Sequence, residues 1–180
     1  MDDASGRFFH PLRISGEGME STVLIATHRK MQAVLELGVG GTGGYGPGNS
    51  LPNVTSMLHV EQLHLHANNL ADFGVHSSGI IRSRFSFLAA THALKSGIKL
   101  QDGFINQIQD CTCAHNLVAG IHLYQNANAV EITHNEISGN LGLGVYVEGG
   151  AQVCLFLYFS TPCAMELPTR VKTVPIVYLM

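Results

Sequence analysis

The 180-residue sequence contains no tryptophan, few charged residues and no long apolar run. Charged side chains make up 13% of the chain, about half of the usual share. Because helical surfaces need many Lys and Glu residues, this scarcity favours β-structure. The longest apolar runs, such as VCLFLYF, are far too short to cross a bilayer. The twenty Gly residues indicate a fold that is rich in turns.

The chain also lacks an excess of basic residues. Its formal net charge of −3 gives no reason to expect a nucleic acid or an anionic membrane surface as a partner. It opens with the acidic segment MDDASGRFF, which has neither the basic nor the apolar region of a secretory signal. Localisation is therefore left open, and an extracellular site is expected only if the N-terminus is incomplete.

Two short motifs suggest a ligand at first sight. Gly38-x-Gly40-x-x-Gly43 matches the fingerprint of dinucleotide-binding proteins, but the Gly and Pro residues after it exclude the helix that must hold the pyrophosphate. Cys111 and Cys113 have the spacing of two metal ligands, but no second pair with matched spacing follows. We therefore expect a surface loop, two small buried side chains, and neither a cofactor nor a metal.

A unit of about 23 residues recurs along the chain. Gly-Val or Gly-Ile pairs begin at positions 74, 97, 120 and 144, which are 23, 23 and 24 residues apart. The second half of the unit recurs after 24 residues: Ile108, Cys111, Cys113 and Asn116 return as Ile132, Asn135, Ile137 and Asn140. A weaker copy, IIRSRFSF, places Phe85 and Phe87 at the positions of the two Cys residues. Such a period predicts a solenoid.

The alternation of side chains along a strand assigns the faces of each unit. In Gly-Ile-x-Leu, the Ile and Leu side chains point inward and x points outward. The alternation ends at His134-Asn135, where a corner can form. Two or three short strands with Gly or Asn corners make one coil of a parallel β-solenoid, and each coil lies ~4.8 Å above the last. Like side chains then form ladders, and we expect stacked amides at Asn116 and Asn140.

The repeat pattern resembles that of a known family. G-I-x-L…V-x-I-x-x-N-x-I-x-x-N…G-I-x-L is similar to the repeats of right-handed parallel β-helix proteins of the pectate-lyase-like superfamily, and LRISGEGMESTVL resembles their opening rung. The likeness covers residues 12–153. It implies an all-β fold, a right-handed parallel β-helix of about seven rungs. Residues 1–153 are expected to form this domain, and residues 154–180 to form a cap or a non-repeat tail.

A leucine-rich repeat fits part of the same pattern. The segment VEQLHLHANNL, residues 60–70, has the Leu and Asn spacing of such a repeat. Leucine-rich repeats continue into a helix or a 3₁₀ segment, whereas a second strand-like signal follows here and good helix formers are few. The β-helix is therefore the preferred prediction.

The resemblance also implies a ligand, because proteins of this superfamily usually bind a polysaccharide along an exposed parallel sheet. The matching outward positions here are Lys99, His122 and Tyr146, followed by Gln101, Tyr124 and Glu148. Tyr rings can pack against sugars, and Lys and His can pair with the carboxylates of an acidic polysaccharide. In an enzyme, His122 or Tyr146 would be the base and Lys99 would stabilise the developing charge. The other three residues would bind substrate.

Catalysis is only one interpretation, because the catalytic motifs of the superfamily are missing. Asp102 and Asp110 are isolated, and neither the Asn-Thr-Asp, Gly-His-Gly and Arg-Ile-Lys motifs of polygalacturonase-like hydrolases nor the Asp-Pro-His-Asp motif of alginate epimerases occurs. Lyase or epimerase chemistry thus stands beside a non-catalytic structural or surface-binding module, which could be a fragment of a larger protein. In that case the outward positions are merely a solvated sheet face.

Four other His residues raise the alternative of a metal site. His64 and His66 point outward on one strand and could bind a metal together with His59 or His76. They have no obvious acidic partner, and zinc needs three or four convergent ligands. A metal site is therefore not part of the prediction.

Overall fold

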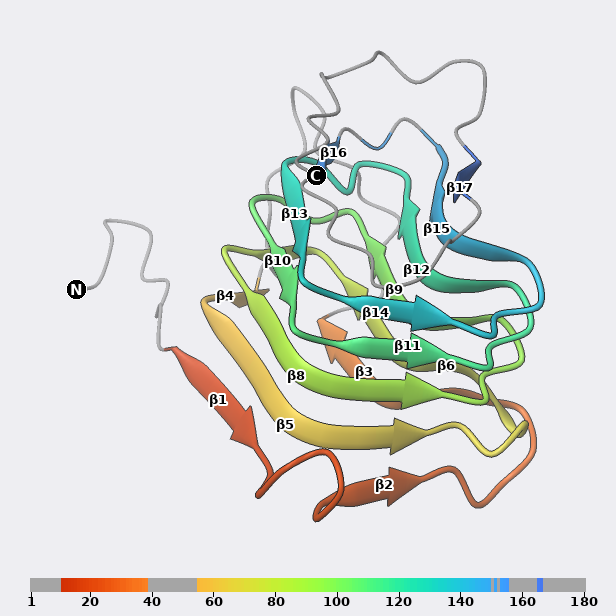
Figure 1. Cartoon of the computed structure of the whole chain (residues 1–180). Helices are drawn as coiled ribbons and strands as arrows, with labels where there is room; N and C mark the ends of the chain where they lie inside the picture. Colours follow the sequence, from red (N-terminus) through yellow and green to blue (C-terminus); the bar gives the residue numbers. More distant parts are fainter. Residues whose placement is uncertain (1–10, 39–54, 150, 152, 156–164, 167–180) are drawn as a thin grey trace.

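The computed structural model describes residues 11–38, 55–149, 151, 153–155, 165 and 166, which wind into a stack of turns (Figure 1). These residues form strands, bends and turns, without a helix. The described part of the chain therefore contains no helix of the length and hydropathy needed to cross a membrane. Each turn passes through one sheet and then through a second sheet, so that strands of successive turns pair in parallel.

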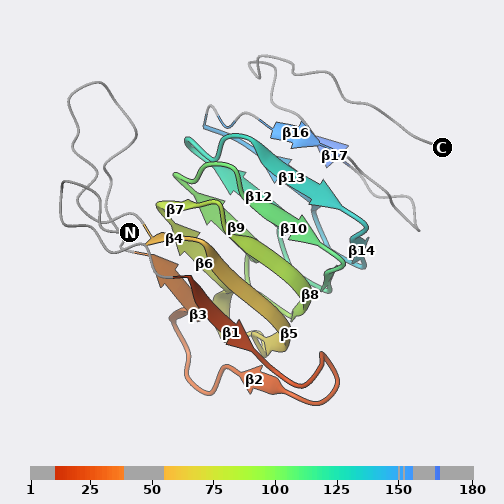
Figure 2. The ribbon, with the colours of Figure 1, turned by 90° about the vertical axis from the view of Figure 1, so that its left-hand side faces the viewer.

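The first sheet is bent, and its outer face is seen in Figure 2. Its main order is β1-β5-β8-β10-β13-β16, with β2, β11 and β14 beyond the bend. In Figure 1, β5 and β8 curve around this bend, whereas later turns have a separate strand on each side of it. The strands are β1 (Leu12–Ser15), β2 (Val23–Ile25), β5 (Leu58–His66), β8 (Arg84–Thr91), β10 (Gln107–Gln109), β11 (Thr112–Ala114), β13 (Val130–Thr133), β14 (Glu136–Ser138) and β16 (Val153–Leu155).

The second sheet has six strands in the order β17-β15-β12-β9-β6-β3. They are β3 (Met31–Gly38), β6 (Ala71–Ser78), β9 (Ser96–Gln101), β12 (Ala119–Tyr124), β15 (Leu143–Val147) and β17 (Met165–Glu166). A short pair, β4 (Thr55–Ser56) and β7 (Ile80–Ile81), joins the two sheets at one corner. The described residues therefore reach six levels, fewer than the predicted seven or so.

Single residues with positive φ turn the chain at its corners. Four successive levels have such a residue at the bend in the first sheet, with φ between 51° and 57°: Gln62, Phe87, Asp110 and His134. One residue in this left-handed conformation redirects the strand and interrupts the alternation of side chains. The corner expected at His134 is confirmed.

Columns of apolar side chains fill the inside of the solenoid. Ile98, Ile121 and Val145 lie opposite one another in the second sheet and are fully buried. Ile108 and Ile132 form the equivalent pair in the first sheet. Full burial of one such side chain stabilises the fold by about 1.5–3 kcal/mol. The repeated Ile and Val positions therefore form the core, as predicted.

Cys111 and Cys113 belong to this core. Both are free thiols with at most 1% of their surface exposed. Burial raises the pKa of Cys111 to about 12, and it raises the pKa of Cys113 well above its usual value. Both side chains are therefore protonated and apolar, which confirms the prediction of small buried residues.

The repeated Gly marks a point where two levels touch. A Cβ atom on Gly97 would lie 2.8 Å from the carbonyl oxygen of Gly120, and one on Gly120 would lie 2.9 Å from that of Gly144. Contacts this short do not occur between a Cβ and a backbone oxygen without a shift of the chain. The close contact thus requires Gly at this position in β6, β9 and β12, where Gly74, Gly97 and Gly120 recur every 23 residues.

Buried Asn side chains close another corner by bonding to backbone groups of neighbouring levels. The Oδ1 atom of Asn116 accepts the amide of Ala93 at 3.0 Å, and its Nδ2 donates to the carbonyl of Ala90 at 3.2 Å. Its Nδ2 also donates to Oδ1 of Asn140 at 2.9 Å, and Asn140 donates to the carbonyl of Cys113. The predicted amide ladder is confirmed, and it satisfies backbone groups that have no strand partner.

Some sequence predictions are corrected or lie outside the described residues. Phe85 pairs with Ile108 rather than with a Cys, and Phe87 sits exposed at the bend, so the alignment of IIRSRFSF was wrong. A strand follows residues 60–70 where a leucine-rich repeat would have a helix. The Gly loop at residues 39–54 and most of residues 154–180 are not described. The loop and the domain division at 153 therefore remain predictions.

Candidate functional site

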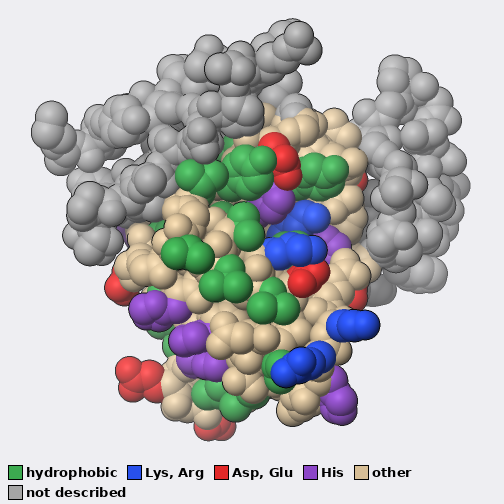
Figure 3. Space-filling model, turned by 90° about the vertical axis from the view of Figure 1, so that its right-hand side faces the viewer, with side chains coloured by type: hydrophobic (Ala, Val, Ile, Leu, Met, Phe, Trp, Pro, Cys, Tyr) green, Lys and Arg blue, Asp and Glu red, His purple; other side chains and the backbone are tan. Residues whose placement is uncertain are grey.

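One outward position of each strand from β3 to β15 contributes to a continuous column across the second sheet. Parallel pairing in register places equivalent residues of β3, β6, β9, β12 and β15 side by side: Glu36, His76, Lys99, His122 and Tyr146. We call this set the outer column. Figure 3 shows positive, negative and His side chains close together on this side of the molecule, bordered by hydrophobic ones. The three proposed catalytic residues are thus neighbours on adjacent strands, although their roles remain predictions.

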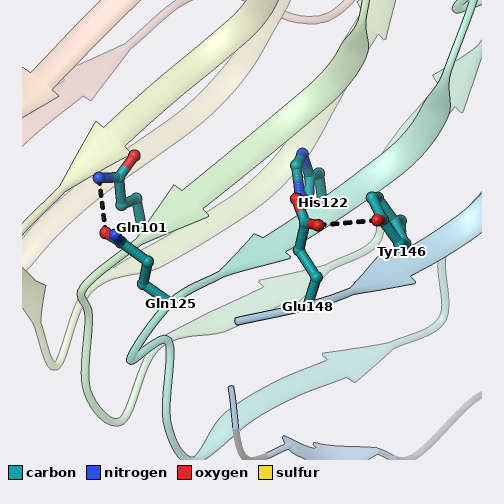
Figure 4. Close-up of polar contacts among 5 residues, drawn as sticks. All are labelled: Gln101, His122, Gln125, Tyr146 and Glu148. Carbon is teal, nitrogen blue, oxygen red and sulfur yellow. Dashed lines mark hydrogen bonds and ion pairs between the residues drawn. The ribbon is translucent and has the colours of Figure 1, made fainter. Parts of the chain in front are cut away.

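The carboxylate of Glu148 contacts two residues of the outer column, His122 and Tyr146. Glu148 lies just after β15, and its Oε1 is 2.9 Å from Nε2 of His122. The hydroxyl of Tyr146 donates to Oε2 of Glu148 at 2.7 Å (Figure 4). The His122 and Tyr146 rings stack with centroids 4.8 Å apart. Glu148, predicted as a substrate-binding residue, therefore orients both candidate bases.

The pKa of His122 is lowered mainly by burial. The hydrogen bond and the charge of Glu148 act in the opposite direction, and the charge of Lys99 adds to the lowering. A neutral imidazole must donate from Nε2 to the carboxylate, which leaves Nδ1 as the unprotonated nitrogen. The arrangement can therefore supply a base at Nδ1, held in place by a carboxylate, as general-base chemistry requires.

Lys99 lies between aromatic rings. Its Nζ is 4.7 Å from the centre of the Tyr124 ring and 5.1 Å from the centre of the Phe73 ring. Burial is the main cause that lowers the pKa of Lys99, with a further lowering by Lys95, whereas Glu148 raises it. An ammonium group between two ring faces is stabilised by cation–π attraction. The charged form of Lys99 can pair with a negatively charged group.

Gln101, the remaining residue of the predicted site, lies apart from the group of His122, Glu148 and Tyr146. Gln101 donates from Nε2 to Oε1 of Gln125 at 2.9 Å, and Figure 4 shows this pair separated from His122, Glu148 and Tyr146. Gln101 neighbours Tyr124 in the sheet register. It therefore borders the site on the side of Tyr124 rather than that of the carboxylate.

Sequence reasoning missed two members of this surface, Phe73 and His76. The ring of His76 stacks on Phe73 with centroids 5.3 Å apart, and its Nδ1 lies 2.6 Å from Nε2 of Gln32. Burial, followed by the charge of Lys99, lowers the pKa of His76, while Gln101 and Glu36 raise it. The repeat contained the signal for this residue, since His76 follows Gly74-Val75 just as Lys99 follows Gly97-Ile98. Phe73 lies before the repeated Gly and had no such signal.

His64, His66 and His76 do not come together in one place. His64 bonds to Thr91, and His66 stacks on His92 with centroids 4.6 Å apart, whereas His76 lies on the second sheet. The structure thus does not bring His76 to His64 and His66, as a shared metal site would need. Within the described ranges, no group of three or more His, Cys, Asp or Glu residues could hold a metal ion.

Comparison with known proteins gives one match. A family model described as "Right handed beta helix region" covers residues 44–156, more than half of the chain. No curated protein and no solved structure matched the chain. Together with the parallel sheets, the family match confirms the predicted all-β fold, a right-handed parallel β-helix.

Proposed function

Because the chain belongs to the family of right-handed β-helix proteins, we propose that it binds an acidic polysaccharide along the outer face of the second sheet. The fold is compatible with such a ligand, and the repeats resemble those of the pectate-lyase-like superfamily. The polymer would lie across β9, β12 and β15, in contact with Lys99, His122 and Tyr146. Tyr124 and Gln101 would contact the next sugar.

The main support for this proposal is the environment of the Lys99 side chain. Its ammonium lies between the rings of Phe73 and Tyr124, next to His122 in the sheet register. A carboxylate on a sugar can pair with the ammonium while the sugar ring packs against an aromatic face. The site thus combines the two kinds of contact that an acidic sugar needs.

Lyase or epimerase chemistry would use the same residues. Nδ1 of His122 would take the proton next to the sugar carboxylate, and Lys99 would stabilise the negative charge that develops. A lyase would then break the adjacent glycosidic C–O bond, with the leaving oxygen protonated by water, whereas an epimerase would return a proton from water to the opposite face of the same carbon. Glu148 would hold the imidazole in place from the other side. In this scheme Tyr146 is a positioning residue, because its hydroxyl donates to Glu148.

A non-catalytic binding module is the second candidate. His122, Tyr146 and Glu148 direct their hydrogen bonds at one another, and the carboxylate of Glu148 adds a negative charge at one end of the face. Both features favour binding at Lys99 without proton transfer. The catalytic motifs of the superfamily are also missing from the sequence.

Titration with polygalacturonate, alginate and a neutral glucan tests the proposal. Since the chain has no Trp, its fluorescence comes from its five Tyr residues, of which Tyr124 and Tyr146 lie in the proposed site. Lys99→Gln should weaken binding of the acidic polymers by about tenfold, the effect of one charge-assisted hydrogen bond. Lys95→Gln is the matched control, because Lys95 is exposed nearby and already paired with Asp72 at 2.7 Å.

The products and the binding data separate the candidates. Formation of unsaturated sugars, followed by ultraviolet absorbance, supports the lyase, and a changed epimer composition of the polymer supports the epimerase. Binding with neither change supports the module. Failure of the unmodified protein to bind either acidic polymer overturns both. Equal losses in the Lys99 and Lys95 variants would show that the ligand lies elsewhere.

A further inference from the structure

A second basic surface lies on the first sheet, away from the outer column. A hollow of about 320 Å³ is lined by His59, Arg82, Ser83, Arg84, Ile105 and Gln107. His59, Arg84 and Gln107 are neighbours in the sheet register, on β5, β8 and β10. Arg82 stands at the corner before β8, with φ of 51°. Two consecutive levels of the solenoid thus bring two guanidinium groups and an imidazole to one place.

Among the residues that the structure describes, no carboxylate lines this hollow. The acidic residues of the neighbouring strands are engaged outside it: Glu61 pairs with Arg13, and Glu131 accepts a hydrogen bond from Gln107 at 2.8 Å. Within the described residues, neither Arg82 nor Arg84 forms an ion pair with an acidic side chain. The positive charge of the hollow is therefore not neutralised by this part of the chain.

A chain of hydrogen bonds fixes the position of Arg84. Its Nε donates to Oε1 of Gln107 at 3.0 Å, and Nε2 of the same amide donates to Oε2 of Glu131. The hydrogen bond from Nε fixes the plane of the guanidinium group. The N–H donors of its two terminal nitrogens can still bind a ligand. Ser83 contributes shape only, because its hydroxyl is bonded to the carbonyl of Ile81 and the amide of Leu58.

We propose that this hollow is a binding site for the oxyanion group of a small ligand, a carboxylate, sulfate or phosphate. Guanidinium groups bind such groups through paired hydrogen bonds, and the volume is near the lower end for ligand sites. Arg84 and Arg82 hold the anion, and a ring N–H of His59 can add a further donor. The site lies on a different sheet from the outer column, so it does not depend on the proposed polysaccharide function.

The test is a nuclear magnetic resonance titration of the arginine Nε–Hε and glutamine side-chain signals. Inorganic sulfate, inorganic phosphate and monomeric galacturonate are added separately, which distinguishes the three sources of the oxyanion. We expect saturable shifts at Arg82, Arg84 and Gln107 with at least one of them. The apparent affinity should fall as ionic strength rises, because the hollow is open to solvent.

Substitutions then locate the site. Arg82→Gln and Arg84→Gln should each weaken binding by about tenfold. Both side chains are exposed, and Gln already adopts the left-handed conformation at Gln62 and Gln125, so both variants should fold. Arg13→Gln is the matched control, since Arg13 lies in the same register but is paired with Glu61.

The Lys99→Gln variant separates this proposal from the first one. It should retain anion binding in the hollow even where it loses the acidic polymers. Absence of saturable shifts with all three anions overturns the proposal. It is also overturned if Arg13→Gln lowers the affinity as much as the other two substitutions.

Discussion

The buried Asn column and the outer column are built by the same repeat but differ in what their members do. Asn116 and Asn140 are the same residue at successive levels, and their amides bond to backbone groups and to each other. Lys99, His122 and Tyr146 also occupy successive levels, but they differ from one another and interact mainly with side chains. A residue repeated unchanged meets a demand of the fold at that corner. Where the residue changes at each level, the fold makes no such demand.

The largest expected effect is the loss of stability on removing an amide from the buried column. Asn116→Ala leaves the amide of Ala93 and the carbonyl of Ala90 without their partners. Two buried unsatisfied groups should lower the free energy of unfolding by roughly 3 kcal/mol, measured by urea denaturation. A loss below about 1 kcal/mol would contradict the structural role of this column. Lys99→Gln in the outer column is the comparison and should change stability much less.

The repeated Gly should behave like the Asn column. Gly120→Ala places a Cβ 2.5 Å from Cγ2 of Ile137 and 2.9 Å from the carbonyl oxygen of Gly144, so overpacking should cost about 2 kcal/mol. Gly79→Ala is the control: Gly79 has φ of 68° and nothing within 4 Å of the added Cβ. The control should lose only about 1 kcal/mol, which is the cost of placing a residue other than Gly in the left-handed conformation. Equal losses in the two variants would show that contact between levels is unimportant.

A third column, formed by His66, His92 and His115, repeats one residue but can change its charge. Successive rings are 4.6 and 5.4 Å apart. The pKa of His92 is lowered from 6.5 mainly by burial, and then by its two neighbours. The unfolded chain therefore takes up protons more readily than the folded chain. The stability contributed by neutral His92 is present above pH 6.5 and is lost as the pH falls below that value.

Replacing one ring measures this effect. His92→Gln cannot titrate, so its free energy of unfolding should fall less between neutral and acidic pH than that of the unmodified protein. Urea denaturation at several pH values gives the two curves. His28→Gln, at an exposed position outside the stack, is the control and should follow the unmodified protein. An identical pH dependence for His92→Gln would mean that the stack does not sense pH.

The smallest effect on stability is expected in the outer column. Glu148→Gln removes the charge that raises the pKa of His122, so that pKa should fall further below its usual value. Stability should change by less than about 1 kcal/mol, because Glu148 is partly exposed. The proton signal of the His122 ring, followed by nuclear magnetic resonance against pH, measures the shift. Glu131→Gln, on the other sheet, should leave the His122 titration unchanged.

The sequence predicted the columns correctly wherever the fold demands one kind of residue. Gly, Ile and Asn recur at fixed spacing where backbone contact, the apolar core and unpaired backbone groups require them. The alignment failed at Phe87, where one left-handed residue shifts the following side chains to the opposite face. Contacts within the outer column had no comparable signal. That Glu148 joins His122 to Tyr146, and that Phe73 lies beside Lys99, depends on packing between side chains of different levels.

The buried thiols of Cys111 and Cys113 allow local opening of the solenoid to be measured by chemical labelling. A thiol reagent attacks the thiolate, and a pKa of about 12 for Cys111 leaves almost none at neutral pH. Neither sulfur can be reached while the levels stay stacked, since both side chains are almost fully buried. In a variant with Cys154 and Cys163 replaced, the rate of alkylation would count how often this level separates from its neighbours. That rate would show whether the turns of the β-helix open one at a time or all together.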